Sequence, residues 1–277
     1  MKSISILLSL ALIVCLQVNG QNHQLVKLWQ TDSVFKVPES VLYDEKNQVL
    51  YVTNIDGTDP WGKDDKGSVG KLGLDGKVIQ VEWVKGLQAP KGMAIHNGIL
   101  YVADLQQLVS IDIKKGEIVN RLTIEGAGGL NDVSIDNKGV IYVTDSKGKK
   151  LFRVENGKAA LYIDPLKGPN GVLSNNNNLL IVDNGGLYKI GADKSLKLIA
   201  DGMDGGTDGI EHVQNDEYLV SCWAGVVYYV KPDGSKQVLI DTRDAKSNTA
   251  DIGYDTKKKI VYVPTFWRNT VVAYQLK

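Results

Sequence analysis

Six segments of the chain share a short entry followed by an apolar run, and the polar residues at these entries are the first candidates for chemistry. The segments read PESVLYD, PKGMAIH, LNDVSID, PNGVLSN, TDGIEHV and TADIGYD. Their entry residues are Glu39, Lys91, Asn131, Asn170, Asp208 and Ala250. Carboxylate and carboxamide oxygens are the hard ligands that calcium prefers; magnesium and manganese accept the same donors, and zinc less readily without His or Cys. If the fold brings the entries together, they predict a divalent-cation site.

The same residues also permit a purely structural interpretation. Without a metal, Glu39 and Asp208 would repel each other if they came close. Lys91 could then offset both charges as an ion pair. We favour the metal site, because several oxygen ligands that converge from different segments suit a divalent ion.

A repeat in the sequence supplies the elements that would bring the entries together. Each entry segment is followed by a polar turn and a second apolar run, and these second runs read LYVTN, LYVAD, IYVTD, LLIVD, YLVSC and VYVPT. They recur about every 40 residues, with one longer gap of about 50 after the first copy. A fixed period in this range that contains only strand patterns is typical of a β-propeller.

Each of the first five copies contains four strand patterns, whereas the sixth stops after its third at Lys277. The N-terminal segment QLVKLWQTD, residues 24–32, is a strand pattern without a repeat of its own. We expect it to complete the sixth blade and close the ring, which would remove the exposed sheet edges. The prediction is an all-β, six-bladed propeller of four-stranded antiparallel blades, a single domain over residues 21–277. The entry residues would then meet at one end of the central channel.

The N-terminus has the pattern of a signal peptide over residues 1–20. Lys2 is followed by a mostly apolar stretch from residue 4 to 16 and then by Val-Asn-Gly, where cleavage is expected. The apolar stretch is too short for a stable membrane span. We therefore expect an exported protein, periplasmic or secreted. Anchoring as a lipoprotein through Cys15 is the less favoured alternative, because the preceding Val14 is bulky.

Composition narrows the set of partners. Lys and Arg together number 32, as do Asp and Glu, so no charge excess points to nucleic acid or to an anionic membrane. After cleavage Cys222 would be alone, so an intramolecular disulfide is excluded and a buried, unreactive thiol is expected. A small molecule is the expected partner, and the sequence identifies no protein partner.

The connection over residues 55–68, IDGTDPWGKDDKGS, is much longer than its counterparts in the other copies. Long loops in compact domains are often functional. Three interpretations remain open for it. It could be a lid that carries Trp61, a loop that binds a cation through its four aspartates, or a surface loop without a ligand.

Other side chains are expected around the same end of the channel, because they follow the second strand of their copies. Trp61, Trp267 and Arg268 are candidates for a substrate pocket with a cationic edge, whereas Trp223 is expected to pack between blades. Recurrent aspartates end three second strands and predict structural hydrogen bonds; they are Asp104, Asp145 and Asp183. The three histidines do not fall in register with the channel entries and predict no histidine pair; they are His23, His96 and His212.

The ordered entries resemble those of the family of six-bladed propellers that contains senescence marker protein (regucalcin), gluconolactonase and luciferin-regenerating enzyme. In that family a Glu opens the first blade, an Asn the third, an Asn-Gly the fourth and an Asp-Gly the fifth. The corresponding motifs here are PES at Glu39, LND at Asn131, PNG at Asn170 and TDG at Asp208. The resemblance extends over nearly the whole mature chain.

The resemblance implies a divalent-metal-dependent hydrolase of a lactone or related ester. It implies that Glu39, Asn170 and Asp208 hold the cation, with calcium as the expected ion, and that Asn131 contacts the metal or the substrate. A cation that polarises the carbonyl while water attacks is consistent with this chemistry. Asp208 is the candidate to position or deprotonate that water.

Three departures from the family pattern bear on specificity. Lactonases of the family often have an Arg two residues before the blade-three Asn, where this chain has Gly129. The first entry is Glu-Ser rather than Glu-Gly, and Lys91 adds a positive charge, so it is a further candidate for substrate binding together with Asn131. The alternative to a hydrolase is a non-catalytic exported propeller that binds a ligand or acts as a scaffold, with a structural calcium in its channel.

Overall fold

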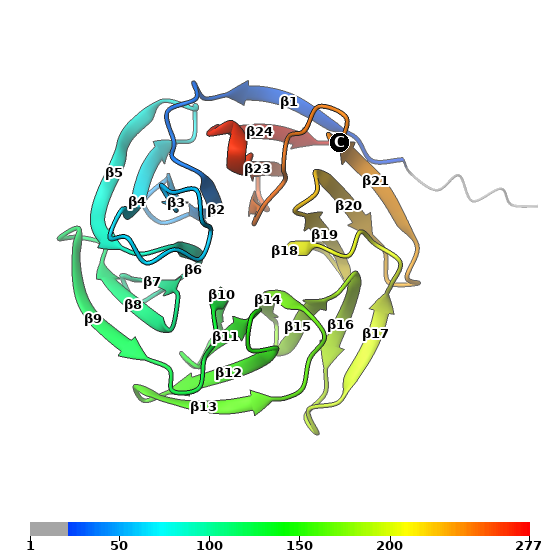
Figure 1. Ribbon diagram of the computed structural model, residues 1–277. Helices are drawn as coiled ribbons and strands as arrows, with labels where there is room; N and C mark the ends of the chain where they lie inside the picture. Colours follow the sequence, from blue (N-terminus) through cyan, green and yellow to red (C-terminus); the bar gives the residue numbers. More distant parts are fainter. Residues whose placement is uncertain (1–21) are drawn as a thin grey trace, which may run out of the picture.

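Six four-stranded antiparallel sheets surround a central axis in the computed structural model, which describes residues 22–277 (Figure 1). The signal peptide expected over residues 1–20 lies outside the described residues. Blade one comprises β2 (Pro38–Asp44), β3 (Val49–Asn54), β4 (Gly67–Gly73) and β5 (Val78–Leu87). Blade two comprises β6 (Pro90–His96), β7 (Ile99–Asp104), β8 (Gln107–Asp112) and β9 (Glu117–Thr123). Blade three comprises β10 (Leu130–Ile135), β11 (Ile141–Asp145), β12 (Lys150–Glu155) and β13 (Lys158–Ile163).

The next two blades repeat the same order from the axis outwards, and the sixth is assembled from both ends of the described chain. Blades four and five comprise β14 (Pro169–Asn175), β15 (Asn178–Asp183), β16 (Gly186–Ile190) and β17 (Leu196–Ala200); and β18 (Thr207–Gln214), β19 (Glu217–Cys222), β20 (Val226–Val230) and β21 (Lys236–Asp241). Blade six contains β22 (Gly253–Asp255), β23 (Ile260–Pro264), β24 (Val271–Leu276) and β1 (Leu25–Gln30), with the short 3-10 helix η1 (Phe266–Arg268) after β23.

The N-terminal strand closes the ring as predicted. β1 pairs antiparallel with β24, and the pairing continues beyond it where Gln24 and Lys277 exchange backbone hydrogen bonds of 3.1 and 2.9 Å. Closure between the two ends leaves every blade flanked by two others. The six-bladed, all-β architecture expected from the repeat is therefore confirmed.

Turn chemistry explains the blades locally. The hairpin of β14 and β15 turns at Asn176 and Asn177, whose φ angles are 46° and 66°. Asparagine tolerates this left-handed conformation better than most residues, and two such residues in sequence match the twist of a tight hairpin. The Asn-rich turn thus fixes the register of the fourth blade.

The core is divided among the blade interfaces. Each of six apolar clusters joins the facing sides of two adjacent blades. In the cluster between blades four and five, Leu180 and Val182 pack with Val220 and Cys222, and all four side chains are fully buried. Burial of apolar side chains between the sheets is the main stabilising contribution in such a fold.

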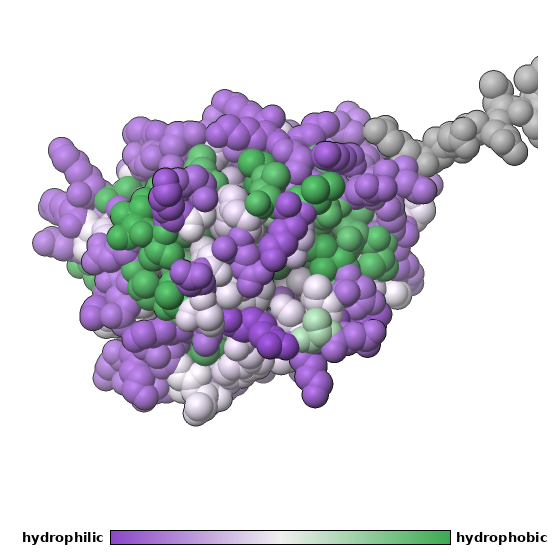
Figure 2. Space-filling model, turned by 90° about the horizontal axis from the view of Figure 1, so that it is seen from above, coloured by the Kyte–Doolittle hydropathy of each residue, from purple (hydrophilic) through white to green (hydrophobic). Residues whose placement is uncertain are grey.

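The rim of the propeller is mixed in character. Figure 2 shows apolar patches on the rim separated by hydrophilic side chains. Exposed apolar residues occur on the outermost strands of the blades, including Leu28 on β1, Ile79 on β5 and Val238 on β21. Among residues 22–277 there is no helix of the length and apolarity that a membrane crossing requires.

Candidate functional site

Irregularities at the start of the inner strands aim the entry residues at the channel. In each of the first five blades the register between inner and second strand shifts just after the first residue of the inner strand, as between Pro38 and Val41 in blade one. Each entry residue and its successor lie within such a bulge. A bulge frees residues from the ladder and redirects their side chains. The same local device therefore brings five entry side chains to one end of the channel.

Hydroxyl side chains of the second strands satisfy several backbone groups that the bulges leave free. The backbone N–H of Ser40 donates to Thr53 Oγ1 at 2.9 Å, and that of Asp132 donates to Thr144 Oγ1 at 2.9 Å. In blade five the N–H of Gly209 donates to Ser221 Oγ at 2.8 Å. These bonds explain why the second strands of blades one, three and five each have a hydroxyl residue one position before their last residue.

Two carboxylates of the entry ring have oxygen atoms without a partner. Glu39 and Asp208 are 4% and 2% exposed, and Glu39 Oε2 and Asp208 Oδ1 are buried atoms that no described residue contacts by a hydrogen bond. Leaving a buried carboxylate oxygen unpaired is costly. Both oxygens are therefore available to a ligand that supplies positive charge or a donor.

The electrostatics of the ring follow from this burial. Burial raises the pKa of Glu39 to about 8; the charge of Lys91 opposes the rise and Asp251 adds to it. Burial also raises the pKa of Asp208 well above its ordinary value, reinforced by Glu39 and Asp251 and opposed by Lys91 and the Asn170 amide. The ring therefore holds protons tightly unless a cation replaces them.

Asn131 is oriented by a chain of hydrogen bonds. Its Nδ2 donates to Ser146 Oγ at 2.9 Å, and Ser146 Oγ donates to the Pro169 carbonyl at 2.6 Å. The amide nitrogen is thereby directed away, and the carbonyl oxygen remains as the end that a ligand can use. Because Pro169 directly precedes Asn170, Ser146 links two of the four predicted metal ligands.

Lys91 points to the long loop rather than forming an ion pair within the ring. Its Nζ donates to the Pro60 carbonyl at 2.9 Å and lies 4.3 Å from the centroid of the Trp61 ring. Burial lowers the pKa of Lys91, while the charges of Glu39, Asp208 and Asp104 oppose that change. Within residues 22–277 no carboxylate oxygen approaches its Nζ to within the 4.0 Å of a salt bridge.

The loop over residues 55–68 lies at the end of the channel where the entries meet, against the entry residue Lys91 of blade two. In Figure 1 it extends from the β3–β4 side of blade one towards β6. Trp61 reaches the third blade, where it lies over Gly129: a Cβ at Gly129 would be only 2.8 Å from its ring. The glycine that stands where family lactonases often have an Arg is thus matched to an indole from the loop. We call residues 55–68 the lid from here on.

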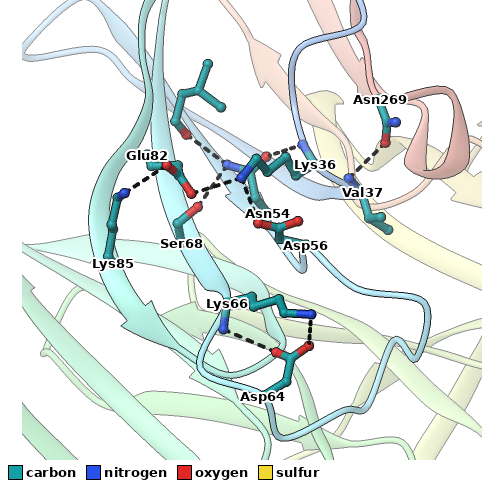
Figure 3. Close-up of polar contacts among 11 residues, drawn as sticks. Lys36, Val37, Asn54, Asp56, Asp64, Lys66, Ser68, Glu82, Lys85 and Asn269 are labelled. Carbon is teal, nitrogen blue, oxygen red and sulfur yellow. Dashed lines mark hydrogen bonds and ion pairs between the residues drawn. The ribbon is translucent and has the colours of Figure 1, made fainter.

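The base of the lid is held by polar contacts (Figure 3). Lys36 Nζ bridges Asp56 at 2.9 Å and Glu82 at 3.2 Å, and the backbone N–H of Lys36 donates to Asn54 Oδ1 at 3.1 Å. Figure 3 also shows the contact of Asp64 with Lys66 further along the lid. Lys36 thus ties the start of the lid, at Asp56, to Glu82 on the outer strand β5, whereas the Asp64–Lys66 pair lies within the lid.

The lid aspartates contact separate partners and do not converge. Asp59 Oδ1 accepts the backbone N–H of Trp61 at 2.9 Å, Asp65 contacts Gln88, and the other two pair with lysines. In the part of the chain that is described, no group of three or more His, Cys, Asp or Glu side chains has a geometry suited to a metal ion. Of the three interpretations of the loop, these contacts disfavour the cation-binding loop, and the contacts of Trp61 with Lys91 and Gly129 are those that a lid would make.

A second layer of carboxylates lies one residue further along the inner strands, and the sequence analysis did not single it out. Asp132 accepts the N–H groups of Val133 and Val172, both at 2.7 Å, and Asp251 Oδ2 accepts Ser40 Oγ at 2.5 Å. Both carboxylates border a cavity of about 200 Å³ inside the channel, together with Glu211. The signal was present, since Asp follows the entry residue in blades three and six.

The aspartates at the ends of second strands have the structural role predicted for them. Asp104 accepts the N–H groups of Gln88 and Ala89, and Asp183 accepts those of Lys167 and Gly168. Asp145 likewise accepts three backbone N–H groups. Each therefore ties the connection that enters the blade to its second strand.

Aromatic side chains of blades five and six lie on the side of the mouth opposite Lys91. Trp223 and Trp267 are 40% and 44% exposed, and each stacks edge-on against the buried Phe266, with centroids 5.5 and 4.8 Å apart. Arg268, predicted to bind substrate, donates instead to the backbone carbonyls of Ala245 and Lys246. Its guanidinium is thus engaged by the connection between blades five and six.

The remaining reactive side chains lie outside the ring. Cys222 is fully buried, and burial raises the pKa of its thiol to about 12. His23 stacks on Tyr229, His96 contacts Asn97 in the turn at the far end of blade two, and His212 contacts the carbonyl of Asn215. No two histidines of the described chain share a site.

Comparisons with known proteins support the fold. No family model matches the chain, and no curated protein matches it. Among solved structures, a propeller provisionally assigned as a gluconolactonase is 15% identical, with 93% of each chain covered and a TM-score of 0.68. Virginiamycin B lyase from Staphylococcus aureus is 12% identical, with 92% of this chain and 99% of that chain covered and a TM-score of 0.67.

A chain of the nidogen–laminin complex is also similar, at 15% identity and a TM-score of 0.63, with 76% of this chain and 86% of that chain covered. The chain is thus similar to six-bladed propellers that include a lyase, a provisionally assigned gluconolactonase and a component of a protein complex. At these identities the likeness concerns the fold, and the functional argument rests on the residues of this channel.

Proposed function

We propose that this protein is a divalent-metal-dependent hydrolase that opens a lactone or related ester, in the manner of a gluconolactonase, and that it works outside the cytoplasm after removal of residues 1–20. The observation that carries the proposal is the pair of unpartnered, buried oxygen atoms of Glu39 and Asp208, which lie beside the oriented carboxamide of Asn131 and the Asn170 amide that contacts Asp208. A structural neighbour provisionally assigned as a gluconolactonase adds support at the level of fold.

The donor set fits a hard cation. Glu39, Asn170 and Asp208 would hold the ion, and Asn131 would complete its surroundings or contact the substrate; calcium is the expected species, with magnesium, manganese and zinc as alternatives. When bound, the ion would polarise the carbonyl of the substrate and stabilise negative charge on its oxygen.

The residues of this chain would do the rest of the reaction. Asp208 positions a water molecule against the carbonyl carbon and takes up a proton from it, and that proton passes to the ring oxygen as its bond to carbon breaks. The product is the open-chain hydroxy acid. Burial under the lid keeps other water away and strengthens the electrostatic interactions within the ring.

A non-catalytic propeller that binds a ligand or serves as a scaffold is the second candidate. The observation that favours it is the near-complete burial of the ring beneath the lid, with Lys91 2% exposed. In that case the cation would stabilise the fold and no turnover would occur.

A hydrolysis assay distinguishes the two candidates. Mature protein would be supplied with calcium, magnesium, manganese or zinc and tested on a panel of aliphatic, sugar and aryl lactones. Turnover that requires a metal and is lost in Asp208→Asn supports the hydrolase. A rise in melting temperature with calcium but no turnover above that of Asp208→Asn supports the scaffold.

A further inference from the structure

Two lysines at the mouth of the channel meet on one indole ring and have no carboxylate partner. Lys91 Nζ lies 4.3 Å and Lys147 Nζ 4.9 Å from the centroid of the Trp61 ring. Neither forms a salt bridge with any carboxylate of residues 22–277. Two ammonium groups this close to one ring repel each other, and an anion between them would offset their positive charge.

Lys91 is the more unusual of the two, because its ammonium group is withdrawn from water. The residue is 2% exposed, and of its three N–H donors only one has an acceptor, the carbonyl of Pro60 in the lid. Buried lysines are ordinarily paired with a charged group. A neutral carbonyl and an aromatic face replace such a partner here.

The acidic residues of the lid do not fill this gap. Asp56 pairs with Lys36, and Asp64 pairs with Lys66. A divalent ion in the ring would balance the charges of Glu39 and Asp208. Asp104, the other carboxylate that acts on Lys91, is already bound by backbone N–H groups and lies 4.0 Å from Arg121. The mouth is therefore positive on the side of blades two and three.

We propose that Lys91 and Lys147 form a subsite for a carboxylate carried by the substrate, and that this group takes the place which the Pro60 carbonyl and the Trp61 ring hold beside Lys91. The inference rests on the proposed function and narrows it to lactones or esters that bear a second, anionic group. Entry of that group displaces the lid at Pro60 and Trp61.

The opposite side of the mouth fits the rest of such a molecule. Blades five and six lie across the ring from blades two and three (Figure 1). They present the exposed rings of Trp223 and Trp267. A substrate would therefore lie with its carboxylate towards the lysines and its apolar part towards these rings, with its reacting carbonyl above the entry ring between them.

Binding of a matched pair of small probes tests the subsite without requiring turnover. The probes are a γ-butyrolactone with a carboxylate on its ring and the corresponding carboxamide. Tryptophan fluorescence is followed in the mature protein with calcium present, immediately after mixing, and Trp61→Phe identifies the signal of the lid. We expect the carboxylate to bind about tenfold or more tightly than the carboxamide, as a charged hydrogen-bond partner typically adds.

Charge variants locate the source of that preference. Lys147→Glu and Lys91→Met are expected to abolish it, whereas Lys138→Glu, an equal charge change on an exposed residue at the far end of blade three, is expected to keep it. If Lys91→Met does not fold, Lys147→Glu decides alone, because its side chain is exposed. Equal binding of the two probes, no binding of the carboxylate, or an unchanged preference in Lys147→Glu would overturn the proposal.

Hydrolysis of the two probes tests the proposed function independently of their binding. A preference for the carboxylate without hydrolysis under any metal would leave the subsite standing and refute the proposed function. Equal kcat/KM for both lactones would support the hydrolase and refute the subsite.

Discussion

The channel contains two layers of carboxylates that differ in what they bind, although their positions differ by only one residue within the repeated entry segments. In the entry ring, Glu39 and Asp208 each keep a buried oxygen that no described residue contacts. In the next layer, Asp132 and Asp251 are held by backbone N–H groups and a hydroxyl of neighbouring blades. Burial alone therefore does not identify a ligand site; the unmet bonding capacity of the buried group does.

The glycines beside the second layer show how it is built. A Cβ at Gly92 would lie 2.2 Å from Asp132 Oδ1, and one at Gly209 would lie 2.4 Å from Asp251 Oδ1. Each aspartate thus occupies space that the adjacent blade leaves open. These side chains connect adjacent blades around the channel, whereas the ring above them is directed to the mouth.

The largest effect should come from removing a carboxylate of the satisfied layer. In Asp132→Ala the N–H groups of Val133 and Val172 lose their acceptor, and we expect the free energy of unfolding to fall by about 4 kcal/mol. Chemical denaturation of the metal-free protein would measure it. Asp208→Ala is the matched control and should cost far less, because its Oδ1 has no partner to lose. Equal losses in the two variants would contradict the distinction between the layers.

Cation binding should depend on the ring and not on the layer below it. At a calcium concentration of about 100 times its dissociation constant, we expect a stabilisation of about 2.7 kcal/mol, seen as a rise in melting temperature. The rise should vanish in Glu39→Gln and Asp208→Asn. It should persist in Asp132→Asn, which keeps an acceptor oxygen. A rise that survives both ring variants would show that the ion binds elsewhere.

The pH dependence of stability should separate the two layers further. The folded pKa values of Glu39 and Asp251 are raised to about 8 and about 7, so the unfolded chain loses these protons at lower pH than the folded one. Stability of the metal-free protein should therefore fall as the pH rises from about 5 to 8, by several kcal/mol, because each group contributes over most of this range.

Glu39→Gln and calcium provide the controls for that slope. The Glu39→Gln substitution and bound calcium should each remove the contribution of Glu39 to the fall in stability with pH. The contribution of Asp251 should remain in both samples. Melting temperatures of the three samples across the pH range would show this. Stability that increases with pH in the metal-free protein would mean that Glu39 is not held in its protonated form.

The sequence predicted the architecture because the repeat is local. Each blade follows from alternating apolar runs and polar turns such as Asn176–Asn177, and the missing strand of blade six required the N-terminal segment. The meeting of the entry residues followed from the same alignment. Their unpartnered oxygens did not, because bonding capacity depends on which side chains from other blades fill the space around them.

Non-local contacts account for what the sequence analysis left open or missed. Trp61 lies over Gly129 from two blades away, and no spacing in the sequence indicates that pairing. Lys147 was not a candidate until its ammonium group was found near the same ring as Lys91. The second layer was missed because the sequence comparison considered only the entry residues themselves, such as Asn131 and Ala250, and not the residues that follow them, Asp132 and Asp251.

The smallest predicted effect concerns the link between the two asparagines of the ring. Ser146 accepts from Asn131 and donates to the carbonyl before Asn170, so Ser146→Ala frees the Asn131 amide to rotate. We expect calcium to bind about five times more weakly, which corresponds to about 1 kcal/mol, with a similar or smaller change in metal-free stability. Ser146→Thr, which keeps the hydroxyl, should restore most of the affinity. Calorimetric titration of both variants would measure this; an alanine variant that binds calcium as the unsubstituted protein does would show that Asn131 needs no positioning, and that the ring is defined by Glu39, Asn170 and Asp208 alone.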